Sequence, residues 1–400
     1  MRPSAKRATA CRPWQLHHAD HHGRTVSRRR PLTVRAWSAA VALAVGLVLA
    51  GLPGQQASAA AAALPPLPAP DSHGLDLLSW SEVPGHGGRL GEATFRTDAV
   101  YRAAGPGQPS IDPVRKPVKA RVLLPADYDP AGDYPVLYLL HGGAADVGQW
   151  SEPGGGDIAE TLRGTAFQGI VVMPEGGRAG WYSDWKGHTD GNFAPQWETF
   201  HIRQLLPWID ANFGTRDGRS GRAIAGASMG GLGALKYGAT HSDLFSAIGS
   251  FSGGTDIRPA DAQRIVDDSM WVYGASFATT GLLDGTYRVT GGTAYRMSTV
   301  FGPPSDWAAF NPVQVAGSAA SYRAYDGRLA LYAGTGETDV YGWNQALHQP
   351  LLDRGVTHRY CTGSGGHDMR LWVQDLRNFV DYVYGSATRA CPNNWAPPAH

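Results

Sequence analysis

A serine flanked by glycines is the first feature with chemical meaning. The segment Gly226-Ala227-Ser228-Met229-Gly230-Gly231 follows the apolar run 223–225 and precedes a helical pattern over 232–237. A nucleophilic serine needs a sharp strand-to-helix turn, where side chains two residues to either side would clash. The turn also places the hydroxyl at a helix N-terminus, which favours developing negative charge. This pattern predicts that Ser228 is a nucleophile, with an ordinary turn serine as the alternative.

Such a serine needs a histidine base and a carboxylate, which follow it in the order acid and then histidine. His367 lies in the glycine-rich loop 363–367, between a late apolar run and the last helical pattern, and is the predicted base. The apolar run 329–333 leads into two acids, Glu337 and Asp339. The spacing from Gly336 favours Asp339, and Glu337 remains the alternative. The acid would hold the histidine tautomer and stabilise the imidazolium.

The developing oxyanion needs two backbone donors. One is the N–H of Met229, directly after the nucleophile. The other is expected in the loop His141-Gly142-Gly143, which ends the apolar run 136–140, and we assign it to Gly143. Because His141 precedes the serine, we interpret it as a loop-shaping or substrate-facing residue rather than as a base.

These residues must be positioned by alternating strands and helices. Apolar runs at 120–124, 136–140, 170–173, 223–226, 245–251, 329–333 and from 360 predict buried strands. One apolar stripe predicts a helix near 197–213, and a second predicts a C-terminal helix through 372–383. The alternation indicates an α/β fold with a mostly parallel central sheet and helices on both faces. Residues 255–327 interrupt it before the last strands, either as a cap over the carboxyl edge or as a packed excursion.

The first 59 residues have the pattern of a secretory signal peptide. Arg28–Arg30 and Arg35 precede the uncharged apolar run 36–52, and Ala57-Ser58-Ala59 offers a cleavage site after Ala59. We predict a secreted protein, with an uncleaved N-terminal anchor as the alternative, and the choice between Sec and Tat export stays open. An Ala/Pro-rich linker is expected over 60–78, a catalytic domain over 79–390 and a tail over 391–400.

Charge and cysteine usage limit the partners. Residues 1–36 hold 9 of the 35 Lys and Arg and 1 of the 34 Asp and Glu, which leaves 26 basic and 33 acidic residues from residue 60 onward. A net charge of −7 argues against nucleic acid or an anionic membrane as the main partner. Cys361 and Cys391 form an even pair in the exported body, which predicts a disulfide. No motif has metal-ligand spacing, so no metal and no cofactor are expected. The oligomeric state stays open.

Several short segments occur in a characteristic order along the region 118–385. They are 136–140 (VLYLL), 173–177 (MPEGG), 181–185 (WYSDW), 197–200 (WETF), 302–306 (GPPSD) and 311–312 (NP). With these segments the region resembles the esterase-D-like branch of the α/β-hydrolases, specifically its secreted mycolyltransferase-like members. The resemblance implies an α/β-hydrolase fold and an acyl-serine enzyme acting on small-molecule or cell-envelope esters, with Ser228, His367 and an acid at 337–339.

Two departures from that family bear on the substrate. His141 stands where the mycolyltransferases carry an acidic residue, and Met369 stands where they carry Trp, so hydrolysis of a simpler ester is favoured. Trp181 and Trp185, with Tyr182, are either an aromatic substrate wall or core aromatics, and Asp184 is a candidate for binding a substrate hydroxyl. We therefore predict a secreted serine esterase. The alternatives are an acyltransferase that uses a sugar or glycerol hydroxyl, and a non-catalytic binding protein.

Overall fold

The central element of the protein is a nine-stranded sheet. The computed structural model describes residues 63–100, 117–188, 193–273, 296–318, 322–385 and 390–391, and the predicted signal peptide lies outside them. The strands are β1 (Asp76–Glu82), β2 (Leu90–Arg96), β3 (Val118–Leu123), β4 (Val136–Leu140), β5 (Ile170–Pro174), β6 (Arg222–Ala227), β7 (Ala247–Phe251), β8 (Leu329–Gly334) and β9 (His358–Gly363). Their order in the sheet is β1-β2-β3-β5-β4-β6-β7-β8-β9. From β5 to β9 neighbouring strands are parallel, which confirms the mostly parallel sheet.

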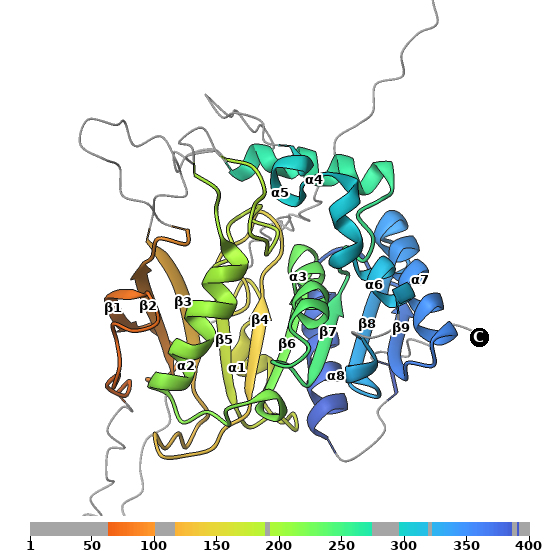
Figure 1. Ribbon diagram of the computed structural model, residues 1–400. Helices are drawn as coiled ribbons and strands as arrows, with labels where there is room; N and C mark the ends of the chain where they lie inside the picture. The colour runs from red at the N-terminus through yellow and green to blue at the C-terminus, as the bar shows by residue number, and fades with distance from the viewer. Residues whose placement is uncertain are drawn as a thin grey trace, which may run out of the picture. The chain divides into compact units, whose positions relative to one another are not determined.

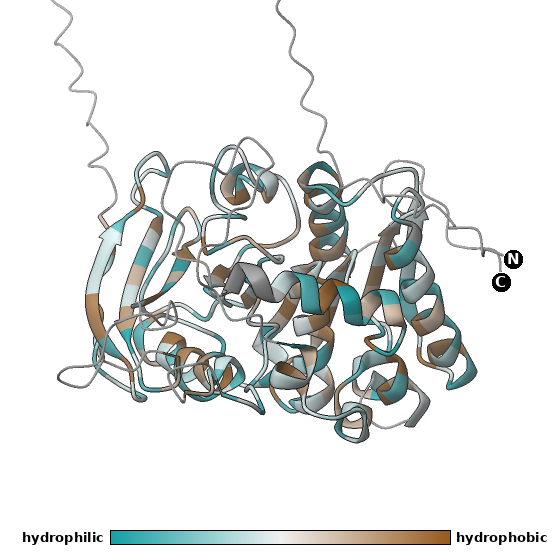
Figure 2. Cartoon of the chain, turned by 90° about the horizontal axis from the view of Figure 1, so that it is seen from above, coloured by the Kyte–Doolittle hydropathy of each residue, from teal (hydrophilic) through white to brown (hydrophobic). Residues whose placement is uncertain are grey.

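The inner strands are apolar throughout because helices cover both of their faces. Every residue of β4, β5, β6, β7 and β8 is buried. Along β4, Tyr138 and Leu140 pack on one side and Leu137 and Leu139 on the other, so each side chain removes apolar surface from water. In Figure 2 the flanking helices carry both hydrophobic and hydrophilic residues, as expected for helices that pack one side against a sheet.

The first helical layer consists of η2 (Thr199–Leu205, a π-helical segment), α2 (Leu206–Asn212), α3 (Met229–Thr240), α6 (Pro312–Ser318) and α7 (Thr338–Asp353). The helix predicted over 197–213 is therefore present as η2 followed by α2, with Pro207, which lacks a backbone N–H, in the first turn of α2. The opposite face is covered by α1 (Ile158–Thr161) and α8 (Met369–Tyr384). Figure 1 shows the two layers on either side of the strands.

The apolar runs do not predict two of the strands. β1 and β2 pair antiparallel with each other, and β2 pairs antiparallel with β3, so the sheet extends beyond its parallel part. The predicted linker is also shorter than expected. The Ala69 N–H donates to the Asn212 side chain at 2.8 Å, the Trp208 indole donates to the Pro70 carbonyl at 2.8 Å, and β1 starts at Asp76. The Trp80 indole also donates to the Pro65 carbonyl oxygen at 3.1 Å, and Leu67 packs against the core, so the chain is attached to the body already from residue 65.

The insertion before the last strands contains α4 (Ala260–Tyr273), α5 (Met297–Phe301), η4 (Pro304–Ala309), α6 and η5 (Tyr322–Tyr325). Helices α4 and α5 lie beyond the carboxyl ends of the central strands (Figure 1), as expected for a cap. At the other end of the chain, Cys361 of β9 and Cys391 form the expected disulfide, with their Cα atoms 5.4 Å apart. Among the described residues, no helix is long and apolar enough to cross a bilayer.

Candidate active site

Ser228 occupies a strained turn between β6 and α3. Its backbone has φ 56° and ψ −117°, a region that residues with a side chain rarely adopt. The flanking glycines allow the turn to fit, because a Cβ on Gly226 would lie 2.4 Å from the Gly230 carbonyl oxygen. A Cβ on Gly230 would lie 2.5 Å from the Leu140 carbonyl oxygen. The chain therefore folds tightly enough here to present a partly exposed hydroxyl at the start of a helix.

His367 reaches this hydroxyl from the loop between β9 and α8. Its Nε2 lies 2.8 Å from Ser228 Oγ, within hydrogen-bond distance. The loop is fixed on its C-terminal side by Asp368, whose side chain accepts from the first N–H groups of α8 and caps that helix. The Trp372 ring packs edge-on against the imidazole, with ring centroids 4.9 Å apart. The structure thus brings together the predicted nucleophile and the predicted base.

The carboxylate beside the imidazole belongs to Glu337. Its Oε1 lies 3.5 Å from His367 Nδ1, and its side chain is only 2% exposed. Asp339, which the spacing from Gly336 favours, lies exposed in the first turn of α7. The preference is corrected because α7 begins at Thr338, so Glu337 precedes the helix and faces inward. The structure therefore contains a serine, a histidine and a buried carboxylate in line.

Backbone donors flank the serine as expected for an oxyanion site. A Cβ on Gly142 would lie 3.5 Å from Ser228 Cβ, so the loop after β4 approaches the nucleophile closely. In that loop, the N–H of Gly142 donates to Gln149 Oε1 at 2.7 Å and the N–H of Ala144 donates to a carbonyl oxygen at 2.7 Å. Gly143 lies between these two engaged donors. Met229 is the first residue of α3, where helix geometry leaves the N–H without a partner in the helix.

His141 is a structural residue of the same loop. It is 1% exposed, its Nε2 accepts from the Gly176 N–H at 2.8 Å, and its Nδ1 lies 2.8 Å from the Gly142 carbonyl oxygen. The Tyr182 hydroxyl donates to the His141 carbonyl oxygen at 2.8 Å. The loop-shaping interpretation therefore fits, whereas the predicted contact of this side chain with substrate does not.

The segment 181–185 is also packed into the protein. The Trp181 indole donates to Ser269 of α4 at 3.0 Å, and the Trp185 indole donates to a backbone carbonyl at 3.2 Å. The two residues are only 8% and 3% exposed. Both carboxylate oxygens of Asp184 accept from Thr199, at 2.9 Å from its N–H and 2.7 Å from its hydroxyl. The predicted aromatic wall and hydroxyl-binding carboxylate are thus corrected to core aromatics and a partner for the start of η2.

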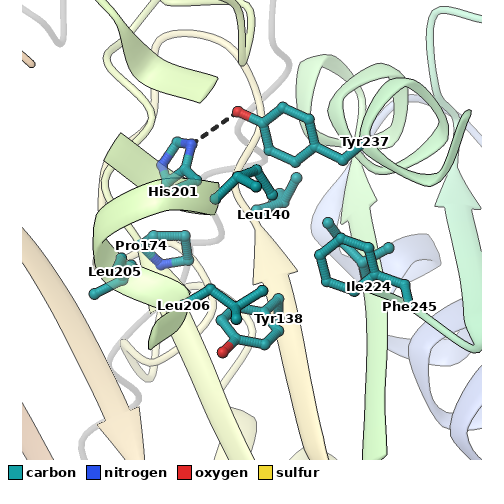
Figure 3. A pocket seen from close by; sticks show the side chains of 10 residues that line it. Tyr138, Leu140, Pro174, His201, Leu205, Leu206, Ile224, Tyr237 and Phe245 are labelled. Carbon is teal, nitrogen blue, oxygen red and sulfur yellow. Dashed lines mark hydrogen bonds between the residues drawn. The ribbon is translucent and has the colours of Figure 1, made fainter. Parts of the chain in front are cut away.

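A small cavity lies in the core, on the face covered by η2, α2 and α3 (Figure 3). Its walls are mostly apolar, and His201 Nδ1 lies 2.9 Å from the Tyr237 hydroxyl at its edge. Burial lowers the pKa of His201 to about 3, so this histidine is neutral at physiological pH. Neither Ser228 nor His367 lines the cavity, and we assign it no catalytic role. The ten lining residues are Tyr138, Leu140, Pro174, His201, Ile202, Leu205, Leu206, Ile224, Tyr237 and Phe245.

Two further residues lie behind the imidazole, and no sequence motif points to them. The Ser252 hydroxyl lies 2.7 Å from Glu337 Oε1, and the Trp372 indole lies 3.0 Å from the same hydroxyl. Ser252 follows β7 and has no motif around it, whereas Trp372 is predictable only as part of an apolar stripe. Neither residue carries a local signal, because the contacts join segments that lie far apart in the sequence. For metals, the described residues contain no group of three or more His, Cys, Asp or Glu that could bind an ion.

The chain is similar in sequence to known proteins. The family described as "Putative esterase" matches residues 113–381. Esterase Rv1288 of Mycobacterium tuberculosis (strain H37Rv) is 38% identical over 261 residues, which are 62% of this chain and 52% of the relative. The diacylglycerol acyltransferase/mycolyltransferase Ag85B of Mycobacterium leprae is 31% identical over 246 residues, or 58% of this chain and 67% of the relative.

The fold has solved counterparts as well. An S-formylglutathione hydrolase from Agrobacterium tumefaciens superposes with a TM-score of 0.53 at 13% identity, covering 77% of this chain and 99% of that one. At this identity the similarity shows the α/β-hydrolase fold alone. The chain spans about half the length of the first curated relatives that it matches. Because the family match covers more than half of the sequence, the chain belongs to this esterase family.

Proposed function

We propose that the protein is a serine esterase that hydrolyses carboxylic esters through an acyl-serine intermediate. The observation that carries the proposal is the 2.8 Å contact between Ser228 Oγ and His367 Nε2 at a strained strand-to-helix turn. The buried Glu337 carboxylate, 3.5 Å from the other ring nitrogen, completes a triad. Small-molecule and cell-envelope esters are the proposed substrate class.

The reaction proceeds in two halves. Ser228 Oγ attacks the ester carbonyl carbon while His367 Nε2 takes the hydroxyl proton, and the N–H groups of Met229 and Gly143 stabilise the oxyanion. The C–O bond to the alcohol then breaks, and His367 returns the proton to the departing alcohol oxygen. In the second half water attacks the acyl-serine, its proton goes to His367, and the acid leaves as Ser228 regains its proton. The Glu337 carboxylate stabilises the imidazolium.

Transfer of the acyl group to an alcohol is the second candidate function, and the similarity to the Ag85B acyltransferase favours it. Hydrolysis and acyl transfer differ only in the molecule that attacks the acyl-serine. Incubation with an ester donor and added glycerol or trehalose separates them, because a transferase forms the new ester in excess of free acid. An esterase releases free acid at a rate that the added alcohol leaves unchanged.

The esterase proposal is tested by turnover of p-nitrophenyl butyrate. We expect Ser228→Ala to lower kcat/KM by at least about 10³-fold, because it removes the nucleophile. Ser305→Ala, on the exposed η4 segment, is the matched control and should keep activity within about twofold. Circular dichroism checks that both variants are folded. Retention of more than a tenth of the activity in Ser228→Ala would contradict the proposal.

Export is proposed from the N-terminal pattern, which lies outside the described residues. Expression of the full chain in a secreting bacterial host, followed by N-terminal sequencing of the culture supernatant, tests it. Cleavage after Ala59 predicts a mature protein that starts at Ala60. Recovery of an uncleaved chain in the membrane fraction would instead establish the anchor.

A further inference from the structure

Ser252 holds an unusual backbone conformation directly after β7. Its φ is 49°, in the left-handed region that residues with a Cβ avoid. The residue is fully buried, and its N–H donates to the Tyr332 carbonyl oxygen of β8 at 2.8 Å. Strain of this kind persists only where the surroundings over-determine it, and it is concentrated at functional sites. The contacts of the Ser252 side chain indicate what this strain achieves.

The Ser252 hydroxyl both accepts and donates a hydrogen bond. The Trp372 indole lies 3.0 Å away and can only donate, so it takes a lone pair of Ser252 Oγ. The hydroxyl proton is then free to point to Glu337 Oε1, at 2.7 Å. A hydrogen bond from a hydroxyl to a buried carboxylate is charge-assisted and about twice as strong as a neutral one. The indole thus fixes which way the Ser252 hydroxyl faces.

The contacts of Glu337 make this hydrogen bond important for the carboxylate. Oε1 also lies 3.5 Å from His367 Nδ1, so the same oxygen faces both the hydroxyl and the imidazole. The other oxygen, Oε2, is buried and has no hydrogen-bond partner among the described residues. The carboxylate is therefore held in orientation chiefly through Oε1. Trp372 contacts the imidazole ring as well, so the indole packs against the base while it orients Ser252.

We propose that Ser252 is a positioning residue that holds the Glu337 carboxylate toward His367 Nδ1 and so maintains the productive tautomer of the imidazole. The inference rests on the proposed esterase function. Ser252 touches neither substrate nor the reacting atoms, and it acts through Glu337. The strained turn after β7 serves this task, because it directs the hydroxyl to the carboxylate at the start of α7.

Two variants separate the role of the hydroxyl from that of the backbone. Ser252→Ala removes the hydroxyl and keeps the strain, whereas Ser252→Gly removes the hydroxyl and relieves the strain, since glycine adopts positive φ readily. Ser250→Ala is the matched control: Ser250 is a fully buried serine in β7, two residues earlier, and its hydroxyl has no partner among the described residues. A purely structural role predicts that Ser252→Gly behaves at least as well as wild type.

We expect both Ser252 variants to lower kcat for p-nitrophenyl butyrate by ~10- to 100-fold, because the loss of a supporting hydrogen bond near a reactive group has an effect of this size. This decrease is smaller than the ~10⁴-fold decrease in kcat that follows the loss of a triad acid. KM should stay within about twofold, because no substrate contact is lost. The low-field proton NMR signal of the His367 Nδ1–H should broaden or move upfield in both variants and stay in place in Ser250→Ala.

The outcomes distinguish failure of the positioning role from failure of the esterase proposal. If both Ser252 variants keep kcat within twofold of Ser250→Ala while Ser228→Ala is inactive, the positioning role is wrong and the esterase function stands. A rise in KM at constant kcat also overturns the role, because it would assign Ser252 to substrate binding. If Ser228→Ala keeps wild-type activity, the esterase proposal itself fails. Should Ser252→Ala not fold, Ser252→Gly decides, since its backbone is unstrained.

Discussion

Replacement of Glu337 by glutamine is the substitution that bears most sharply on the assignment of the acid. The glutamine side chain has the same shape as glutamate but no charge. In the wild type the Ser252 hydroxyl lies 2.7 Å from Glu337 Oε1, and the amide oxygen of glutamine can still accept this hydrogen bond. If its amide nitrogen faces His367 Nδ1 instead, the imidazole is forced into the tautomer with its proton on Nε2. That tautomer cannot accept the proton of Ser228.

The expected magnitude follows from the geometry. When His367 takes the proton, the imidazolium lies 3.5 Å from Glu337 Oε1. At an effective dielectric constant of about 20, a charge pair at that distance is worth about 5 kcal/mol. Since about 1.4 kcal/mol corresponds to a tenfold change in rate, loss of the charge should lower kcat by ~10³- to 10⁴-fold.

The assay is the steady-state hydrolysis of p-nitrophenyl butyrate, with kcat and KM measured separately. Asp339→Asn is the matched control, because Asp339 lies exposed in the first turn of α7. We expect this control to keep kcat within about twofold of wild type. Retention of more than a tenth of kcat by Glu337→Gln, or a loss of more than a hundredfold in Asp339→Asn, would overturn the assignment of Glu337 as the acid.

Three further predictions concern stability, each measured by urea denaturation. Burial raises the pKa of Asp375 well above its usual range, so the folded state keeps a proton that the unfolded chain releases. The stability of the wild type relative to Asp375→Asn should therefore fall as pH rises above ~4, by at most roughly 1.4 kcal/mol per pH unit. A stability difference between the two proteins that does not change with pH would contradict this. Burial opposes ionisation of Glu198, but Lys236 and His241 together outweigh this effect and lower the pKa of Glu198 to about 2. Glu198→Gln should therefore lower the free energy of unfolding by ~3 kcal/mol at pH 7. The stability difference between wild type and variant should vanish as pH falls from ~4.5 toward 2. An unchanged difference at pH 2 would refute this. Cys391→Ser removes the disulfide to Cys361, which closes a loop with a sequence separation of 30. We expect the free energy of unfolding to fall by ~3 kcal/mol. A fall of less than ~0.5 kcal/mol would show that the disulfide adds little stability.

The parallel part of the fold was predictable because its signals are local. Buried strands in a parallel sheet are apolar along their whole length, and a glycine-flanked serine between such a strand and a helix is typical of a nucleophile. β1 and β2 have no comparable signal. β1 is largely exposed at the sheet edge, and in β2 buried residues alternate with partly buried ones, so neither strand forms a continuous apolar run.

The site was predictable as far as residue type and chain order could determine it. The choice between Glu337 and Asp339 depended on where α7 begins, and a shift of one or two residues in a helix start exchanges inward and outward positions. The hydrogen bonds of Trp181 and Asp184 could not be inferred from the segment itself, because their partners Ser269 and Thr199 come from other parts of the chain. Contacts of this kind depend on the tertiary fold.

Every step of the proposed reaction requires Ser228 to be an activated nucleophile. A fluorophosphonate reacts covalently with such a serine, so incubation with this probe, followed by intact-mass measurement and peptide mapping, identifies the nucleophile. We expect one adduct per chain on the peptide that contains Ser228, with no labelling of Ser228→Ala and slow labelling of His367→Gln. An adduct on another peptide, or equal labelling of wild type and Ser228→Ala, would show that Ser228 is not the nucleophile.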